Sequence, residues 1–283
     1  MRFGFIGAGK VGCSLGKYLT VNGFSVSGYF SRSSSSAEYA AALTGTECFG
    51  DINILAGKSD VILLTVPDKA LAGVYNELEK TELGGKLLCH CSGAMTADEV
   101  FSGIEKYGAS ACSVHPLFPV SSRENSYKEL GRAYFCLEGS KRGTELWQNV
   151  LTKLGNPSRV ISADVKSRYH AACSVISNLV CALADESLSL MLSCGFTAKE
   201  ALSALRPLAE NNIKSIFDKD PLSALTGPVE RNDTETVKRH LKCMTDPAGR
   251  EIYIALSKKL VDMAMKRHPD GDYSEMNKLL SEK

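Results

Sequence analysis

The chain has 283 residues, and its 33 lysines and arginines nearly balance its 32 aspartates and glutamates, leaving a formal net charge of +1. Without a basic block it does not resemble a protein that binds nucleic acid or a membrane surface through a charged face. The N-terminus has no signal-sequence pattern, and no uninterrupted apolar run reaches the roughly 18 residues of a membrane span. We therefore expect a cytoplasmic protein.

The ten cysteines form neither a disulfide framework nor a metal-binding pattern. None occurs as C-x-x-C, and most lie inside apolar runs, so we expect small buried side chains in a reducing compartment. Cys89, His90 and Cys91 are adjacent, but alternation along a strand sends both thiols to the face opposite the imidazole. Because no second ligand cluster completes a site, we predict no bound metal.

The N-terminus carries a strand, a glycine-rich turn and a helix. Arg2–Ile6 is apolar, Lys10–Val21 has a helical pattern, and G-x-G-x-x-G stands between them at Gly7, Gly9 and Gly12. Gly7 permits a sharp turn, Gly9 lets the backbone approach a pyrophosphate, and Gly12 lets the helix pack against the strand. The helix N-terminus adds free N–H groups for an anion. We predict dinucleotide binding, the alternative being a glycine turn that matches by chance. The cofactor-binding residues expected here are Gly7, Ala8, Gly9, Lys10, Val11 and Gly12.

Strand-like and helix-like segments alternate through the first half of the chain. This alternation predicts an α/β domain, a Rossmann-type doubly wound parallel sheet with helices on both faces. The predicted strands are Arg2–Ile6, Ser25–Phe30, Val61–Val66, Lys86–His90, Ser110–Val114, Ala133–Glu138 and Arg159–Ile161. The predicted helices among them are Lys10–Val21, Ala37–Leu43, Lys69–Lys80 and Thr96–Lys106.

The segment after the second predicted strand indicates which dinucleotide binds. Proteins that prefer NAD place a carboxylate about 20 residues beyond the glycines, where it holds the ribose 2′-hydroxyl. This chain has Ser31, Arg32 and Ser33 instead, with no carboxylate before Glu38. Because an arginine among hydroxyls suits a 2′-phosphate, we predict NADP as the cofactor. The alternative is a solvated serine-rich loop.

Three further segments follow predicted strands, where ligands of open α/β sheets bind. Val66 ends the third of these strands and Pro67 follows it, while Ser92 comes after the fourth strand and His115 after the fifth. We expect Val66, Pro67 and Ser92 to flank the nicotinamide and its ribose. His115, before Pro116, either stands where a substrate enters or is a hydrogen-bonded histidine in a rigid turn.

The pattern becomes helical after Ser162, which predicts a dinucleotide-binding domain at 1–163 and an all-α C-terminal domain at 164–283. Asp164 is the predicted N-cap of a long helix that ends near Cys194. This helix is apolar nearly all the way round, which predicts burial on every side. We expect it to form the spine of the second domain or a subunit interface, and hence a homodimer through the helical domain.

One row of the long helix is polar. Lys166, His170, Ser174 and Asn178 recur every three to four residues and therefore share one face. His170 has an intrinsic pKa suited to delivering a proton near neutral pH, and Lys166 or Asn178 can orient a substrate. The alternative is a polar seam that joins the two domains through hydrogen bonds.

Residues typical of helix ends indicate where the later helices begin and end. Thr197 and Glu200 form a capping box, Pro207 is expected to break or restart that helix, and Asp246 precedes a last long helix to about Lys266.

A loop before the predicted cap Asp233 carries a candidate for binding a substrate carboxylate. Gly227 and Pro228 fix a turn there, and Arg231 follows it. The alternative is a salt bridge from Arg231 to Glu230 or Asp233.

Taken together, these motifs resemble an uncharacterised two-domain family with a Rossmann-like NAD(P)-binding domain and a C-terminal helical domain of unknown function. The corresponding motifs here are Gly7/Gly9/Gly12, Ser92-Gly93, His115-Pro116, Tyr169-His170-Ala171-Ala172 with Ser177-Asn178, and Gly227-Pro228 with Arg231, Asp233 and Thr236. More distantly, the chain is similar to ketopantoate reductase, pyrroline-5-carboxylate reductase, prephenate dehydrogenase and the β-hydroxyacid dehydrogenases. The β-hydroxyacid dehydrogenases place a lysine and an asparagine four residues apart on this helix, whereas Lys166 is followed at that spacing by His170.

The resemblance implies an NADP-linked oxidoreductase fold and names no substrate. We expect an enzyme that reduces a small carbonyl or imine compound, bearing a carboxylate, in a cleft between the domains. His170 is the expected proton donor. The residues expected around the substrate are His170, Lys166, Asn178, Ser92, His115 and Arg231. The alternative function is a non-catalytic NADP(H)-binding module that senses redox state through a partner.

Overall fold

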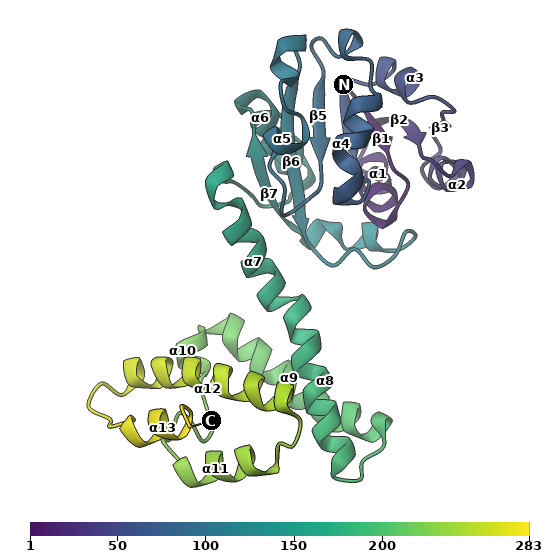
Figure 1. Cartoon of the computed structure of the whole chain (residues 1–283). Helices are drawn as coiled ribbons and strands as arrows, with labels where there is room; N and C mark the ends of the chain where they lie inside the picture. Colours follow the sequence, from purple (N-terminus) through teal and green to yellow (C-terminus); the bar gives the residue numbers. More distant parts are fainter. Residues whose placement is uncertain (283) are drawn as a thin grey trace. The chain divides into compact units, whose positions relative to one another are not determined.

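An eight-stranded sheet organises the first of two units in the computed structural model, which describes residues 1–282 (Figure 1). The division gives a sheet unit, Met1–Ile176, and a helical unit, Ser177–Lys283. The predicted boundary at residue 163 precedes this division. The difference arises because helix α7 (Lys166–Ile176) begins with side chains that bond to the sheet: Lys166 contacts Ser113, and Tyr169 contacts His115.

The sheet has the strand order β3-β2-β1-β4-β5-β6-β7-β8, and neighbouring strands are parallel except for β6 and β7. This order confirms the predicted doubly wound α/β fold. The strands are β1 Arg2–Ile6, β2 Ser25–Phe30, β3 Glu47–Cys48, β4 Val61–Leu64, β5 Leu87–His90, β6 Ser110–Leu117, β7 Tyr134–Gly139 and β8 Ser158–Val160. Strand β3 has only two residues, too few for an alternating pattern to reveal it.

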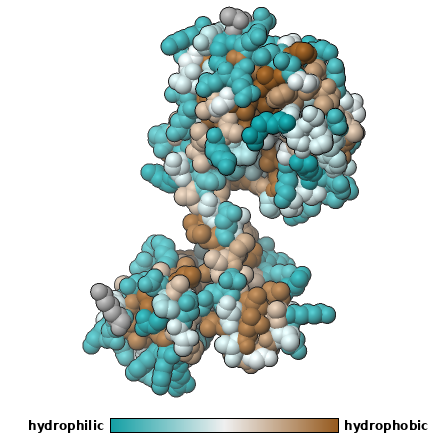
Figure 2. Space-filling view, turned by 45° about the vertical axis from the view of Figure 1, so that its right-hand side comes forward, coloured by the Kyte–Doolittle hydropathy of each residue, from teal (hydrophilic) through white to brown (hydrophobic). Residues whose placement is uncertain are grey.

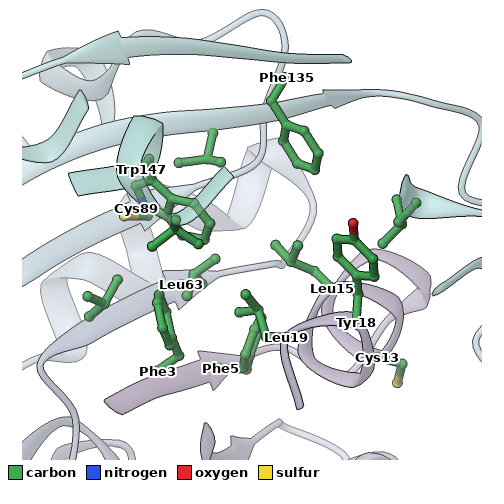
Figure 3. Packing of buried hydrophobic residues seen from close by; sticks show 14 of the residues in the cluster. Phe3, Phe5, Cys13, Leu15, Tyr18, Leu19, Leu63, Cys89, Phe135 and Trp147 are labelled. Atoms are coloured by element: carbon green, nitrogen blue, oxygen red, sulfur yellow. Dashed lines mark hydrogen bonds between the residues drawn. The ribbon is translucent and has the colours of Figure 1, made fainter. Parts of the chain in front are cut away.

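Helices cover both faces of the sheet. They are α1 Lys10–Val21, α2 Ser34–Thr44, α3 Ile52–Gly57, α4 Asp68–Glu77, α5 Ala97–Val100 and α6 Lys141–Leu154. Side chains of β4 alternate between two apolar clusters: Val61 and Leu63 face α1, α2 and α6, while Ile62 and Leu64 face α3, α4 and α5. Figure 3 shows part of the first cluster, where Trp147 of α6 lies beside Cys89. This two-sided burial explains the continuous apolar run of β4.

Strand β6 is longer than its apolar run predicted. It continues to Leu117, so His115 lies within the antiparallel ladder opposite Cys136 of β7, and Pro116 lies opposite Phe135. The interpretation of His115 and Pro116 as a rigid turn is therefore wrong. The strand β7 was predicted at Ala133–Glu138 as part of a parallel sheet, and its antiparallel pairing with β6 keeps this segment extended.

The helical unit consists of α8 Asn178–Ser193, α9 Ala198–Asp218, α10 Pro221–Ala224, α11 Thr234–Cys243, α12 Pro247–Arg267 and α13 Ser274–Leu279. Its core is formed by α11, α12, α13 and the loop before α11, with Val237, Val261 and Met276 almost fully buried. The predicted capping box of Thr197 with Glu200 is confirmed, as are the caps Asp233 and Asp246.

Two predictions about the helices are wrong. The long helix is interrupted at Ser177, where φ is −116° and ψ is −77°, so α7 and α8 are separate helices. Pro207 does not break its helix and lies inside α9. Because the φ of proline is already helical, a single internal proline removes one hydrogen bond without forcing the chain out of the helix.

The predicted burial of the long helix on all sides is also wrong for the single chain. Helix α8 has no buried residue, and Val175 and Leu179 are 59% and 54% exposed. The stretch Ala163–Ser193 is long and apolar enough to cross a membrane by length and composition alone, and none of its most apolar window is buried in the chain. Apolar areas are visible on the surface of the helical unit in Figure 2. Large exposed apolar patches are typical of interaction sites.

Candidate functional site

The glycine turn between β1 and α1 has the geometry that a dinucleotide needs. Gly7 has φ +108°, and a Cβ on it would lie 2.7 Å from the carbonyl oxygen of Thr65. A Cβ on Gly12 would collide with the carbonyl oxygen of Gly7. At Gly9, the nearest atom to such a Cβ is the Thr65 oxygen, 3.9 Å away, so this side of the turn is open. Gly7 thus permits the sharp turn, Gly9 leaves the turn open to a ligand, and Gly12 allows the helix to pack closely against the turn.

A cavity of about 290 Å³ lies beside this turn. Its lining residues are Ile6, Gly7, Ala8, Gly9, Phe30, Ser31, Arg32, Thr65, Val66, Pro67, Ala70, Gly73, Val74 and Glu77. The cavity therefore brings together the predicted turn, the predicted 2′-phosphate residues Ser31 and Arg32, and the end of β4 with Val66 and Pro67. Sequence reasoning missed Thr65, whose hydroxyl donates to the carbonyl of Gly7 at 2.7 Å.

The remaining predicted cofactor residues lie outside this lining. Lys10 and Val11 begin α1, and Gly12 is buried under the turn. Ser33 is the N-cap of α2, and its hydroxyl accepts a hydrogen bond from the amide of Ser36 at 3.4 Å. Because Gly9 caps α1 without a side-chain hydrogen bond, the first amides of that helix have no capping side chain. These residues fit a bound pyrophosphate.

Ser92 lies in a turn after β5 and is bonded within it. Its hydroxyl donates to the carboxylate of Asp68 at 2.8 Å and accepts from the amides of Ala94 and Met95 at 3.2 and 3.1 Å. Asp68 is the first residue of α4, so this contact joins the ends of β4 and β5. The hydroxyl of Ser92 thereby fixes the turn on which Gly93 stands.

His90 is a fully buried histidine of the core. Its Nδ1 accepts a hydrogen bond from the amide of Ser92 at 3.1 Å, so Nε2 carries the proton and donates to the carbonyl of Thr96 at 3.2 Å. Burial, with repulsion from Lys166, lowers the pKa of His90 to about 3. As the alternation predicted, His90 packs toward Phe101 while Cys89 accepts a hydrogen bond from Trp147 on the other face. Residues 1–282 hold no group of three or more histidine, cysteine or acidic side chains placed for a metal.

Two imidazoles and a phenol meet next to Gly93. The hydroxyl of Tyr169 lies 2.6 Å from Nδ1 of His115, and the rings of His115 and His170 have centroids 6.0 Å apart. A Cβ on Gly93 would lie 2.5 Å from Nδ1 of His170 and 2.9 Å from Nε2 of His115. Nδ1 of His170 is buried and has no hydrogen-bond partner within the described part of the chain. The structure thus places two predicted residues together, His115 and His170, with Tyr169 as a third that was named from the sequence only as part of a family motif.

Lys166 occupies a different environment from His170. Its ammonium is buried, forms an ion pair with Glu138 at 3.3 Å and donates to the hydroxyl of Ser113. Ser113 in turn donates to the carbonyl of Ser92 at 3.2 Å, and Glu138 accepts from the amide of Ala97 at 2.9 Å. Burial lowers the pKa of Lys166, and the charge of Glu138 opposes this effect. The lysine predicted to orient a substrate therefore has internal partners, because α7 packs this end against β6 and β7.

The other two predicted substrate residues belong to the helical unit. Asn178 is the first residue of α8 and is exposed, and Arg231 is exposed in the loop before α11. The salt bridges weighed for Arg231 are not formed. Glu230 instead bonds to His268 at 2.8 Å, and Asp233 caps α11 through Thr236. Both Asn178 and Arg231 stay predictions.

Comparison with family models identifies both parts of the chain. A model described as a Rossmann-like domain matches residues 1–116. A second, described as a domain of unknown function (DUF2520), matches residues 133–260. These matches confirm the two-domain resemblance that the motifs indicated. Comparison with curated proteins gives no match.

Several solved structures have the same fold over nearly the whole chain. Protein TM1727 from Thermotoga maritima is 24% identical with a TM-score of 0.74, covering 94% of this chain and 99% of its own. An imine reductase from Myxococcus stipitatus in complex with NADP⁺ is 17% identical with a TM-score of 0.64, covering 99% and 100%. A reductive aminase from Aspergillus terreus in complex with NADPH4, cyclohexanone and allyl amine is 14% identical with a TM-score of 0.64, covering 98% of both. At these identities the similarity establishes the fold.

Proposed function

Because the chain belongs to the two-domain family that joins a Rossmann-like domain to a DUF2520 domain, we propose that it is an NADP(H)-dependent oxidoreductase. The observation that carries the proposal is the cavity in which the glycine turn and the exposed Arg32 meet. The turn and the first amides of α1 would hold the pyrophosphate, and Arg32 would bind the 2′-phosphate. Two of the structures with this fold are complexes with NADP⁺ or NADPH4.

We further propose that the substrate is a small carbonyl or imine compound. The bound cofactor would supply hydride, so the protein must hold the substrate and provide a proton. His170, with an unpartnered Nδ1 beside Gly93, is the proposed proton donor, and His115 lines the same place. Lys166 would act indirectly, through Ser113 and the turn at Ser92. Arg231 is the residue proposed to bind a substrate carboxylate, and Asn178 is the residue proposed to orient the substrate.

Replacing Arg32 with alanine tests the cofactor. Losing a charge-assisted contact to the 2′-phosphate is expected to weaken NADPH binding about 10- to 100-fold, while NADH binding changes little. Isothermal titration calorimetry with each nucleotide measures both. The matched control is Arg159→Ala, which removes an exposed arginine of β8 that does not line the cavity. Unchanged NADPH affinity in Arg32→Ala, or wild-type protein that binds NADH more tightly, contradicts the assignment.

Replacing His170 with alanine tests the reaction. NADPH oxidation is followed against a panel of 2-oxo acids, aldehydes and cyclic imines, and His170→Ala is compared on any compound that wild-type protein reduces. Loss of the proton donor should lower kcat about 10²- to 10⁴-fold without changing NADPH affinity. His268→Ala is the control, since its imidazole bonds to Glu230 in the helical unit. Full turnover by His170→Ala would remove its role. Tight NADPH binding with no turnover of any compound would favour the redox-sensing module.

We propose that a second copy of the chain covers the apolar surface of the helical unit. The support is that α8 has no buried residue, together with exposed Leu208 and Phe217 of α9, 71% and 72% accessible. Closed homodimers are the commonest solution to such a surface. Light scattering at micromolar concentration should give twice the 30.5 kDa chain mass. A monomer at that concentration contradicts the proposal.

The proposed compartment is the cytoplasm. All ten cysteines are free thiols, as expected for a protein in a reducing environment.

A further inference from the structure

Tyr169 was not among the residues expected at the site, but its hydroxyl lies within hydrogen-bond distance of His115. We propose that Tyr169 is a positioning residue: its hydroxyl donates to Nδ1 of His115 and fixes His115 as the tautomer that carries its proton on Nε2, next to Gly93 and His170. This inference rests on the proposed function for its role in catalysis. The contact itself can be tested without substrate or cofactor.

The direction of the hydrogen bond follows from the two groups. Tyr169 and His115 are 2.6 Å apart at their polar atoms, and their rings meet edge to face at 84°. A phenol O–H is a stronger donor than a neutral imidazole N–H, and an imidazole nitrogen is a better acceptor than a phenol oxygen. Burial also raises the pKa of Tyr169 well above its usual value, so the phenol keeps its proton. Nδ1 of His115 is therefore the acceptor, and Nε2 carries the hydrogen.

The surroundings of His115 keep it neutral. Burial lowers its pKa to about 4; the nearby His170 and Lys166 act in the same direction, and Asp68 acts against them. A neutral imidazole is a poor proton source near pH 7. It can donate one hydrogen bond from Nε2, and that bond polarises a carbonyl or imine without transferring a proton.

Gly93 has no side chain, and this lets both imidazoles lie next to it. Its missing Cβ leaves room for Nδ1 of His170 and Nε2 of His115, which would otherwise lie 2.5 and 2.9 Å from that atom. Gly93 does not have a positive φ, so its small size, rather than its backbone freedom, is what the site requires.

These contacts assign different roles to the two histidines. His115, held by Tyr169, would hold the oxygen or nitrogen of a C=O or C=N group through its N–H. Hydride from the nicotinamide of NADPH would reach the carbon, the electron pair of the double bond would move to that heteroatom, and the heteroatom would take a proton from His170. The products would be NADP⁺, an alcohol or amine, and His170 with one proton fewer. The substrate class implied is one whose reducible group accepts a hydrogen bond.

The test measures the tautomers of the histidine rings by ¹⁵N NMR on the full-length protein. The wild-type protein should show His115, assigned by His115→Gln, as a single neutral tautomer with protonated Nε2 from pH 7 to pH 5. In Tyr169→Phe the same ring should become a mixture of tautomers, and its pKa should rise toward the ordinary value near 6.5. Wild-type His115 protonated at Nδ1, or a tautomer unchanged in folded Tyr169→Phe, overturns the proposal. The wild-type spectrum decides the direction of the bond even when the variant does not fold.

The helical unit supplies a matched control. Nδ1 of His240 lies 2.8 Å from the hydroxyl of Tyr253, and these rings also meet edge to face, at 88°. Tyr253→Phe should alter the His240 signals and leave His115 unchanged. On an identified substrate, Tyr169→Phe should lower kcat about tenfold or more with a smaller change in KM, whereas Tyr253→Phe should change neither. If the tautomers behave as expected but no substrate is reduced, the positioning holds and the proposed reaction fails.

Discussion

Glu138→Ala is expected to lower the free energy of unfolding of the sheet unit by about 3–5 kcal/mol, because it leaves the buried ammonium of Lys166 without its counter-charge. Lys166 and Glu138 are 2% and 4% exposed, and their charged atoms are 3.3 Å apart. The amide of Ala97 also loses its acceptor. Urea unfolding followed by fluorescence measures the change, since the single tryptophan, Trp147, is fully buried in this unit.

Two controls separate the charge effect from ordinary truncation. The exposed pair of Lys58 with Glu47 has a similar distance, 3.2 Å, but both side chains are about half exposed, so Glu47→Ala should cost no more than about 1 kcal/mol. The double variant Lys166→Met/Glu138→Leu removes both charges and should recover much of the stability lost in Glu138→Ala. An equal cost for Glu138→Ala and Glu47→Ala would contradict a desolvated, charge-dependent pair.

The same buried pair has a consequence at the site. Lys166 bonds to Ser113, and Ser113 bonds to the carbonyl of Ser92, one residue before Gly93. Breaking the ion pair between Lys166 and Glu138 should therefore disturb the turn at Gly93, beside which the two imidazoles lie. Through this connection a buried lysine could affect the reaction proposed beside Gly93.

The glycine motif and the alternating strands were predictable because their signals are local. Gly7, Gly9 and Gly12 mark a turn by spacing alone, and the apolar run of β4 reflects burial on both sheet faces. The partners of Lys166 were not predictable in this way. Glu138 stands 28 residues earlier in an apolar strand, and only the antiparallel pairing of β6 with β7 brings Ser113 opposite it. The helical spacing of Lys166 and His170 correctly indicated that they share one face of the helix. Spacing alone does not indicate which residues of other elements pack against each of them.

Burial of the long helix failed as a prediction for a related reason. A helix that is apolar on every face is unfavourable in water, but its sequence does not indicate which other surface will cover it. In one chain α8 has no buried residue. The pairing of Tyr169 with His115 was equally hidden, since it depends on β6 continuing through Pro116.

Gly7→Ala is expected to weaken NADPH binding by more than about 100-fold, a loss near 3 kcal/mol of binding free energy. Two effects add at this position. A left-handed φ of +108° disfavours any side chain by about 1–2 kcal/mol. In addition, the new Cβ would lie 2.7 Å from the carbonyl oxygen of Thr65, and the turn must move to relieve that contact. A displaced turn no longer aims the first amides of α1 at a pyrophosphate.

Gly23→Ala separates these two effects. Gly23 has φ +82°, and a Cβ on it would have no neighbouring atom within 4 Å, so alanine there meets the backbone penalty without a collision. It should lower the free energy of unfolding by about 1–2 kcal/mol and leave NADPH affinity as in the wild type. Calorimetric titration with NADPH, beside urea unfolding of both variants, compares binding with stability. If Gly7→Ala remains folded and binds NADPH as tightly as Gly23→Ala, the glycine turn does not hold the cofactor. A loss confined to Gly7→Ala, in folded protein, assigns the binding to the turn itself.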